Sequence, residues 1–414
     1  MIYAVSIVLD KRRLKSDGTY PLKLRVFNRQ LKKDKRYPLD IGLHEKEFIE
    51  LWRNPDNLKF RGAKKELELK LKGIEARANE VAKQLTVFDF EQFETKFFRK
   101  SSDKNNVKYY FDTVIKNKTD DNKIGTAQSY KYTLNSLKQF SEIEKKLNVD
   151  KLTFSIINVS WLKEYEKFML NKGKSYTTIA IYTRTLRVIF NIAIENNDII
   201  NDIYPFGKNK YKIPRTKKVK KALNSTQLKL LFNAEPLNEN ETKCKDFWFF
   251  SFACNGMNLK DIALLKYSDI KGDKFSYYRA KTFDKSAEKS VITIYLTDFT
   301  QGVIKKYCNK KKDSFVFNIV DAADDIETQY KKIKNFNRYI NDHIKRIAIA
   351  NDLPKDISFY YARHSFATNS LRKGASMEFI SEALNHSDLS VTMNYFAGFE
   401  DEAKKEFANT IMDF

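Results

Sequence analysis

Cysteine is scarce in this chain of 414 residues. Its three cysteines, Cys244, Cys254 and Cys308, lie far apart in the sequence. A disulfide framework or a structural zinc site needs cysteines, or cysteines and histidines, at short spacing. The four histidines are equally scattered and form no H-x-x-x-H pair. We therefore expect reduced thiols, no metal and no other cofactor, so any chemistry must use other side chains.

Long apolar runs are also missing. No stretch approaches the roughly 20 apolar residues of a membrane-spanning helix. The N-terminus, MIYAVSIVLDKRR, has its charges after the apolar run, which is the reverse of a secretory signal. We expect a soluble, unexported protein of the cytoplasm.

Acidic residues are few relative to basic ones. The chain has 53 Asp and Glu against 76 Lys and Arg, a net charge of +23. Such an excess favours a polyanionic partner, with nucleic acid ahead of an anionic membrane. Because 42% of the residues are hydrophobic, the chain can bury real cores, and its length suggests two to four domains.

The first 42 residues alternate between apolar and polar positions. The segments YAVSIVL, YPLKLRVF and KRYPLDIGL predict three antiparallel strands. Residues 11–36 hold eleven basic residues against two acidic ones, and Lys23 and Arg25 share the face opposite Leu22 and Leu24. This basic face is either solvated or laid against the phosphates of a nucleic acid.

Helical periodicity dominates the next part of the chain. Apolar residues in steps of three and four predict an amphipathic helix from about 58 to 85, which we expect to link modules. Residues 105–206 are helical throughout. In the third of these helices a few polar residues lie among apolar ones, as a solvated face or as phosphate contacts: Thr177, Thr178, Arg184 and Arg187.

Residues 207–221 form a strongly basic connection. The segment GKNKYKIPRTKKVKK has eight basic residues, no acidic one, and a proline that blocks a continuous helix. We interpret it as a flexible cationic tether between domains that close around a duplex; the alternative is a linker that only adds solubility. The candidate DNA contacts here are Lys208, Lys210, Arg215, Lys217 and Lys218.

The remaining residues, 222–414, are mostly helical. They begin with a Ser/Thr-capped helix in LNSTQLKLLF, and FSYYRAKT and SVITIYLT predict a β-hairpin. Lys281 falls at the end of a hairpin strand. Without metal ligands, phosphoryl transfer would need fixed cations around the phosphate and a nucleophilic side chain.

Arg363 and Tyr395 are the candidates for those two tasks. Arginine presents a planar fork that fits two phosphate oxygens, and a lysine such as Lys281 can protonate a leaving oxygen. On composition alone, a structural salt link involving Arg363 and His364, and a core position for Tyr395, remain open.

The order of these residues resembles that of the tyrosine recombinase (phage-type integrase) family. Its members carry H-x-x-R-H, then L-G-H, and a tyrosine nine residues after that histidine. In ISFYYARHSFATNSLRKGASMEFISEALNHSDLSVTMNYF, Arg363 and His364 match R-H, Asn385 stands at the glycine, and Tyr395 falls at the nucleophile. RAKT resembles the segment with the hairpin lysine, and CNGMNLKDIALLKYSDI the first-arginine segment. The likeness is strongest to integrases of Bacteroides-type mobile elements.

Two departures from the family pattern matter for the chemistry. Asn258 stands where the first catalytic arginine is expected, and Tyr360 stands for the histidine of H-x-x-R. Asparagine can donate a hydrogen bond but carries no charge, so transition-state stabilisation falls by about 2–4 kcal/mol unless another group compensates. Lys260 and Arg279, close in sequence, are the candidates for the missing cation.

The resemblance implies a mainly α fold with small β-sheets. It places an arm-site-binding domain, with a three-stranded sheet and a linker helix, at 1–95 and a helical core-binding (SAM-like) domain at 105–206. The basic linker at 207–221 then leads to an α-rich catalytic domain with a β-hairpin at 222–414.

The resemblance also implies the chemistry. Tyr395 would attack the scissile phosphate to form a 3′-phosphotyrosyl link, and Lys281 would protonate the leaving 5′ oxygen. His364 would act as an acid, a base or an orienting group. The residues that would grip the phosphate are Arg363, Asn258, Tyr360 and His386.

The implied function is site-specific recombination for the integration and excision of a mobile element. The implied partners are double-stranded DNA at core and arm sites, further copies of this chain in a synaptic tetramer, and DNA-bending factors from the host or the element, all in the bacterial nucleoid. Two alternatives stay open: a DNA-binding protein of this fold that has lost catalysis, suggested by Asn258, and a type IB topoisomerase, which would not need the basic sheet.

The last residues predict one more amphipathic helix. Ala403, Phe407 and Ile411 recur every four residues in DEAKKEFANTIMDF. In the family such a tail packs on a neighbouring protomer; the alternative is docking on its own domain.

Overall fold

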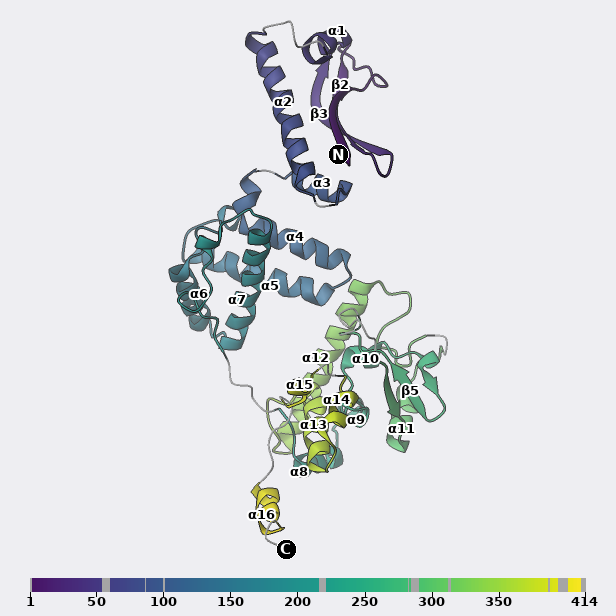
Figure 1. Ribbon diagram of the computed structural model, residues 1–414. Coiled ribbons are helices and arrows are strands. Elements are labelled where there is room, and N and C mark those ends of the chain that lie inside the picture. The colour runs from purple at the N-terminus through teal and green to yellow at the C-terminus, as the bar shows by residue number, and fades with distance from the viewer. Residues whose placement is uncertain are drawn as a thin grey trace. The chain divides into compact units, whose positions relative to one another are not determined.

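The computed structural model describes two compact units (Figure 1). One comprises residues 1–110, 147–158 and 189–205, and the other comprises 111–146, 159–188 and 206–414. None of the helices that the structure describes is long and apolar enough to cross a membrane. The described residues are 2–53, 60–85, 87–99, 101–215, 221–281, 283, 290–311, 314–385, 388–393 and 401–410.

The N-terminal sheet has the three strands that the sequence predicts. Strands β1 (Tyr3–Leu9), β2 (Tyr20–Asn28) and β3 (Lys33–Leu43) pair antiparallel in the order β1-β2-β3. Alternation along β2 buries Leu22 and Leu24 completely because successive side chains of a strand point to opposite faces.

The helix expected to link modules also packs on this sheet. Helix α2 (Gly62–Lys83) contacts β1 and α3 (Phe90–Phe97), and the short α1 (Glu45–Phe48) follows β3 (Figure 1). Leu71 and Ala78 of α2 share one hydrophobic core with the sheet. Since the apolar stripe of α2 is buried against β1, the helix forms part of the core of this unit in addition to connecting it to the next residues of the chain.

Residues 105–206 are helical, as predicted. The helices are α4 (Val107–Asp120), α5 (Ile124–Ile143), α6 (Val159–Asn171) and α7 (Tyr176–Glu195). Phe140 of α5 packs edge-on against Trp161 of α6, with ring centroids 4.8 Å apart. Such aromatic pairs add to the hydrophobic stabilisation of a helix interface.

Part of the predicted tether is anchored. Tyr211 is buried beside Phe206 and donates a hydrogen bond to the Glu166 carboxylate of α6, with 2.5 Å between the oxygens. The prediction of a flexible segment from residue 207 onward is therefore wrong for its first five residues. This segment is anchored because the buried ring of Tyr211 has a partly exposed polar partner, Glu166, which a count of charges does not reveal.

The C-terminal part combines helices with a second small sheet. Strands β4 (Ile270–Lys271), β5 (Lys274–Tyr277) and β6 (Ile292–Tyr295) pair antiparallel in that order and contain the predicted hairpin. A mainly α fold with small β-sheets is thereby confirmed. The helices are α8 (Ser225–Asn233), α9 (Glu239–Ala253), α10 (Leu259–Ala263), α11 (Asp298–Tyr307), α12 (Ile326–Ala350), α13 (Tyr360–Arg372), α14 (Met377–Ala383), α15 (Leu389–Met393) and α16 (Asp401–Thr410).

Helix α8 is capped by Asn224 rather than by the serine or threonine expected. The Asn224 side chain accepts from the backbone N–H of Gln227, and the Gln227 side chain accepts from the backbone N–H of Asn224. This reciprocal capping box satisfies two backbone groups that the first turn of a helix leaves unpaired.

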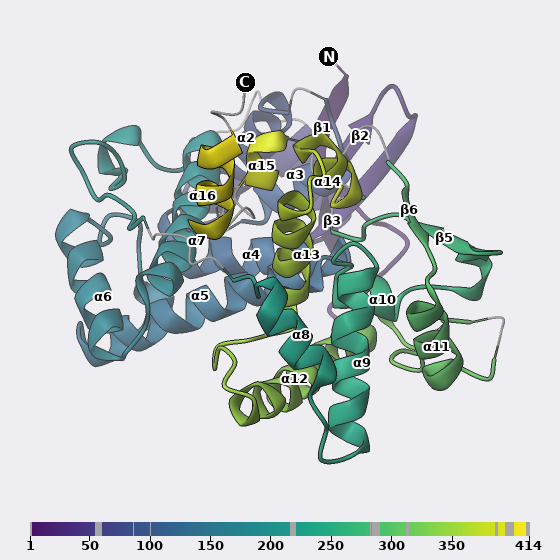
Figure 2. The ribbon, with the colours of Figure 1, turned by 90° about the horizontal axis from the view of Figure 1, so that it is seen from below.

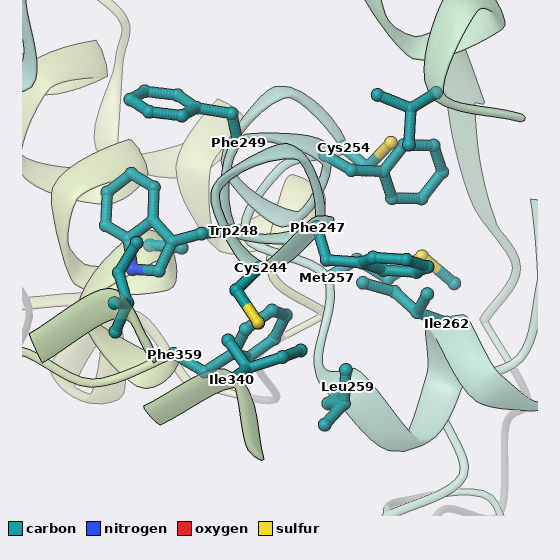
Figure 3. Packing of buried hydrophobic residues seen from close by; sticks show 14 of the residues in the cluster. Cys244, Phe247, Trp248, Phe249, Cys254, Met257, Leu259, Ile262, Ile340 and Phe359 are labelled. Carbon is teal, nitrogen blue, oxygen red and sulfur yellow. The ribbon is translucent and has the colours of Figure 1, made fainter. Parts of the chain in front are cut away.

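Helix α9 is the centre of the C-terminal core. Phe247, Trp248 and Phe250 are almost completely buried. Figure 3 shows Phe247 and Trp248 on α9, with Ile262 of α10 and Ile340 of α12 nearby. Helix α13 packs against α9 (Figure 2), so this core fixes the helix that carries Arg363.

Candidate active site

Arg363 lies on the inner side of α13, where only 2% of its surface is exposed. Its guanidinium donates one hydrogen bond to the carbonyl of Gly256 (3.0 Å) and one to the carbonyl of Leu384 (2.6 Å). These acceptors belong to the loop before α10 and to the end of α14. Carbonyl oxygens orient a guanidinium without neutralising it, so Arg363 keeps its attraction for a phosphate.

Gly256 is required for this arrangement. Its φ of 66° lies in the left-handed region that side chains rarely adopt. A Cβ at this position would come within 2.6 Å of the Cα of Arg363. The loop can therefore approach α13 and offer its carbonyl only because residue 256 has no side chain.

Asp261 is a buried carboxylate beside the arginine. It accepts hydrogen bonds from the backbone N–H of Ala280 (3.0 Å) and from the side-chain amide of Asn258 (3.4 Å). Burial raises the pKa of the Asp261 carboxyl, while Arg279 and Arg363 act in the opposite direction. Asn258, which occupies the first-arginine position, is thus partly engaged by this carboxylate.

Arg279, one of the two candidates for the missing cation, is buried in this site. It is 7% exposed, and its Nη1 donates to the carbonyls of Leu384 and Asn385, both at 3.3 Å. The Leu384 oxygen also accepts from Arg363. Two guanidinium groups from different parts of the chain therefore converge at the end of α14. Closeness in sequence to the lysine motif had named Arg279 as a candidate without indicating this contact.

Lys281 lies in an exposed turn and not in a strand. Strand β5 ends at Tyr277, so the expectation that Lys281 ends a hairpin strand is wrong. The backbone N–H of Ala280 bonds the Asp261 carboxylate instead of a neighbouring strand, and Arg279 turns inward. Ladder pairing therefore stops before the lysine.

His364 follows Arg363 on α13 and is half-buried. Burial, and then the charges of Arg363 and Lys221, lower the pKa of His364 to about 4. Its imidazole is therefore neutral near pH 7, which favours the orienting role over that of a cationic acid. Tyr360 is 44% exposed, and its ring meets the His364 ring edge-on with centroids 4.9 Å apart.

The segment after Leu384 explains one departure from the family motif. Asn385 has a φ of 48°, and asparagine tolerates this left-handed conformation better than most residues. It can therefore stand at the family's glycine position. Its side chain accepts a hydrogen bond from the Ser290 hydroxyl at 2.6 Å. The predicted His386 and Tyr395 lie outside the described residues.

The two basic residues that the sequence places on one face of β2 are paired with carboxylates. Lys23 and Arg25 lie on the face opposite the buried leucines, as predicted from the alternation. The Lys23 ammonium lies 2.7 Å from Asp10, and the Arg25 guanidinium 3.1 Å from Asp34. These carboxylates offset part of the positive charge that the sequence places on this face.

The other candidate DNA contacts that the structure describes lie at exposed positions. Thr177, Arg184 and Arg187 are exposed on α7. In the basic linker, Lys208, Lys210 and Arg215 are exposed, while Lys217 and Lys218 lie outside the described residues.

The described residues contain no group of three or more His, Cys, Asp or Glu side chains that could hold a metal ion. Cys244 and Cys254 are buried free thiols, and Cys308 is an exposed one.

Comparison with known proteins identifies two domains of one family. Residues 106–213 match the phage integrase SAM-like domain, and residues 221–402 match the phage integrase family. The chain is 23% identical over 305 residues to a XerC-like tyrosine recombinase of Caldanaerobacter subterraneus subsp. tengcongensis, covering 63% of this chain and 72% of that protein. It is 22% identical over 298 residues to the transposase of transposon Tn916 from Enterococcus faecalis, covering 64% and 69%.

A similar fold is seen in the Tn1549 transposon integrase in complex with a circular intermediate DNA. The TM-score is 0.51 at 16% identity, over 74% of this chain and 99% of that one. With both domains matched, the chain belongs to the phage integrase family, the tyrosine-type site-specific DNA recombinases.

Proposed function

We propose that this protein is an integrase that cuts and rejoins duplex DNA at specific sites and so integrates and excises a mobile element. The observation that carries the proposal is the guanidinium of Arg363, buried and held by two backbone carbonyls beside the segment that leads to His386. The Tn916 and Tn1549 relatives support the link to mobile elements.

In this proposal the Tyr395 hydroxyl attacks the scissile phosphorus and releases its proton. A phosphotyrosyl bond forms to the 3′ strand, and the bond from phosphorus to the 5′ oxygen breaks. Lys281 supplies a proton to that oxygen. Arg363 stabilises the charge that develops on the nonbridging oxygens, with Asn258, Tyr360 and His386 as further donors. A 5′-hydroxyl from a partner strand then reverses these steps, so the bond energy is retained.

The remaining modules would position the DNA. We assign arm-site binding to residues 1–95, core-site binding to 105–206 and cleavage to 222–414, with 207–221 as the connection. Exchange of two duplexes requires several active sites, which we assign to a synaptic tetramer aided by DNA-bending factors of the host or the element. Since the substrate is bacterial DNA, the protein would work at the nucleoid in the cytoplasm.

Covalent capture tests this function and selects the DNA site in the same experiment. The full chain is incubated with a pool of randomised duplexes that carry a nick, denatured in SDS, and the DNA that remains attached is sequenced. We expect attached DNA that shares a core sequence with wild type and none with Tyr395→Phe.

Arg363→Ala should give no detectable adduct on the captured sequence, because it removes the charge at the phosphate. Arg346→Ala, an exposed arginine on α12, is the matched control and should cleave like wild type. If wild type binds DNA but attaches none, the protein is a binder of this fold without catalysis. Measurable adduct with Arg363→Ala would contradict the assigned role of this arginine.

A further inference from the structure

We infer that Tyr278 and Phe283 are positioning residues whose paired rings hold the turn that carries Lys281, the proposed proton donor to the leaving 5′ oxygen. The inference rests on the proposed cleavage reaction and adds to it the residues that place one of its groups. Both aromatic residues follow the end of β5, one on each side of the lysine along the chain.

The two rings meet across the turn. Their centroids are 5.5 Å apart, and the planes of the Tyr278 and Phe283 rings cross at 69°. Aromatic pairs prefer this edge-to-face arrangement, which is worth about 0.5–1.5 kcal/mol beyond the area that the rings bury. The pair therefore joins a point three residues before Lys281 to a point two residues after it.

Two hydrogen bonds of the backbone fix the same turn. The N–H of Phe283 donates to the carbonyl of Arg279 at 3.1 Å. The N–H of Ala280 donates to the Asp261 carboxylate at 3.0 Å, which fastens the start of the turn to α10. Lys281 lies between these bonded positions. Because its side chain is a flexible four-carbon stem, a fixed backbone is what limits the places that the ammonium can reach.

The aromatic pair is exposed and adds little to the core. Tyr278 is 49% exposed and Phe283 is 39% exposed. The two neighbours of Tyr278 along the chain, Tyr277 and Arg279, are buried, so the alternation of the strand carries Tyr278 to the outer side. Since exposed rings bury little apolar area, removing one of them should disturb the turn far more than the fold.

The chemistry of the leaving group provides the test. When sulfur replaces the scissile 5′ oxygen, the leaving thiolate is a much weaker base than an alkoxide and departs without a proton. Lys281, and any residue that acts through it, is then no longer needed. Residues that bind the DNA or maintain the fold are needed on both substrates.

The rate of adduct formation is measured at saturating DNA on the captured core sequence, with oxygen or sulfur at the scissile position. With oxygen, Tyr278→Ala and Phe283→Ala should each react about 10–10²-fold more slowly than wild type, because a mobile lysine loses part of the benefit of a positioned acid. With sulfur, both variants and Lys281→Ala should react at close to the wild-type rate. Tyr278→Phe keeps the ring and should react like wild type on both duplexes.

Tyr295→Ala is the matched control. Tyr295 is a tyrosine of the same small sheet, 65% exposed, and the Lys274 ammonium lies 5.7 Å from the centre of its ring. This variant should cleave both duplexes at the wild-type rate. Phe283→Leu keeps apolar bulk without the ring, and it should reproduce the Phe283→Ala pattern if the alanine variant does not fold.

Three outcomes would overturn the inference while the wild-type adduct still supports the proposed function. Equal defects of Tyr278→Ala on the two duplexes would mean that the pair serves DNA binding or the fold. Wild-type rates on both would mean that the turn is held without the rings. A Lys281→Ala variant that sulfur does not restore would mean that Lys281 is not the proton donor.

Discussion

At the scale of single residues, His364 is the group whose chemistry the structure changes most. The sequence left it as an acid, a base or an orienting group. With its pKa lowered to about 4 by burial and by nearby positive charge, the imidazole is neutral at physiological pH. It remains available to orient Tyr360, whose ring it contacts.

This shift predicts a loss of stability at mildly acidic pH. The unfolded chain takes up a proton on His364 near pH 6.5, whereas the folded protein does so only near pH 4. The folded state binds fewer protons between these values, so the free energy of unfolding falls as pH decreases from 6.5 to 4.

Denaturant unfolding at pH 7 and at pH 4.5 measures this effect, with His364→Gln as the comparison. The variant should lose less stability than wild type between the two pH values. Subtracting the stability loss of the variant from that of wild type cancels the contribution of titrating groups that both proteins contain, such as Asp261. Equal losses would show that His364 titrates alike in the folded and unfolded chain.

At the scale of elements, the turn before α10 determines where Arg363 can lie. Gly256 and Gly272 offer a matched pair, because both have a positive φ, 66° and 63°. A Cβ would strike the backbone of Arg363 at Gly256 but would meet nothing within 4 Å at Gly272.

We therefore expect Gly272→Ala to cost about 1–2 kcal/mol of stability, the penalty of the left-handed conformation alone. Gly256→Ala should cost more and should also slow adduct formation, because α13 or the turn must shift. Unfolding by denaturant and the rate of adduct formation measure the two effects. Equal stability losses, with cleavage unaffected, would mean that the turn can move without disturbing the arginine.

The elements themselves were largely predictable from the sequence. Apolar alternation gave the strands of the N-terminal sheet, and steps of three and four residues gave α2 and the helices of 105–206. The order of Arg363, His386 and Tyr395 gave the family. Contacts between distant segments could not be predicted from periodicity or motif spacing. These include the burial of Tyr211 against Glu166, and the turn that takes Arg279 inward and leaves Lys281 outside β5.

At the scale of the whole molecule, the C-terminal helix α16 (Asp401–Thr410) has two expected docking places, a neighbouring protomer or its own domain. In the sequence, Ala403 and Phe407 recur at the spacing that predicts one apolar side. If this side packs on a neighbouring protomer, removal of residues 401–414 should leave cleavage of isolated sites intact and abolish pairing of two sites.

Gel electrophoresis of complexes with one and with two core duplexes distinguishes these outcomes. The truncated chain should form the single-duplex complex and the covalent adduct but not the paired complex. Normal pairing after truncation would mean that the helix docks on its own domain.

The position of the buried Tyr211 limits the distance between the helical segment before it and the C-terminal core after it. The next fixed point along the chain is Leu223, which is buried in the C-terminal core and bonded to Ser365 of α13. A fully extended chain between these two residues spans about 40 Å, slightly more than one turn of B-DNA, about 34–36 Å. Tyr211 and Leu223 can therefore lie at most slightly more than one helical turn of B-DNA apart, which limits the separation of the two segments that these residues anchor.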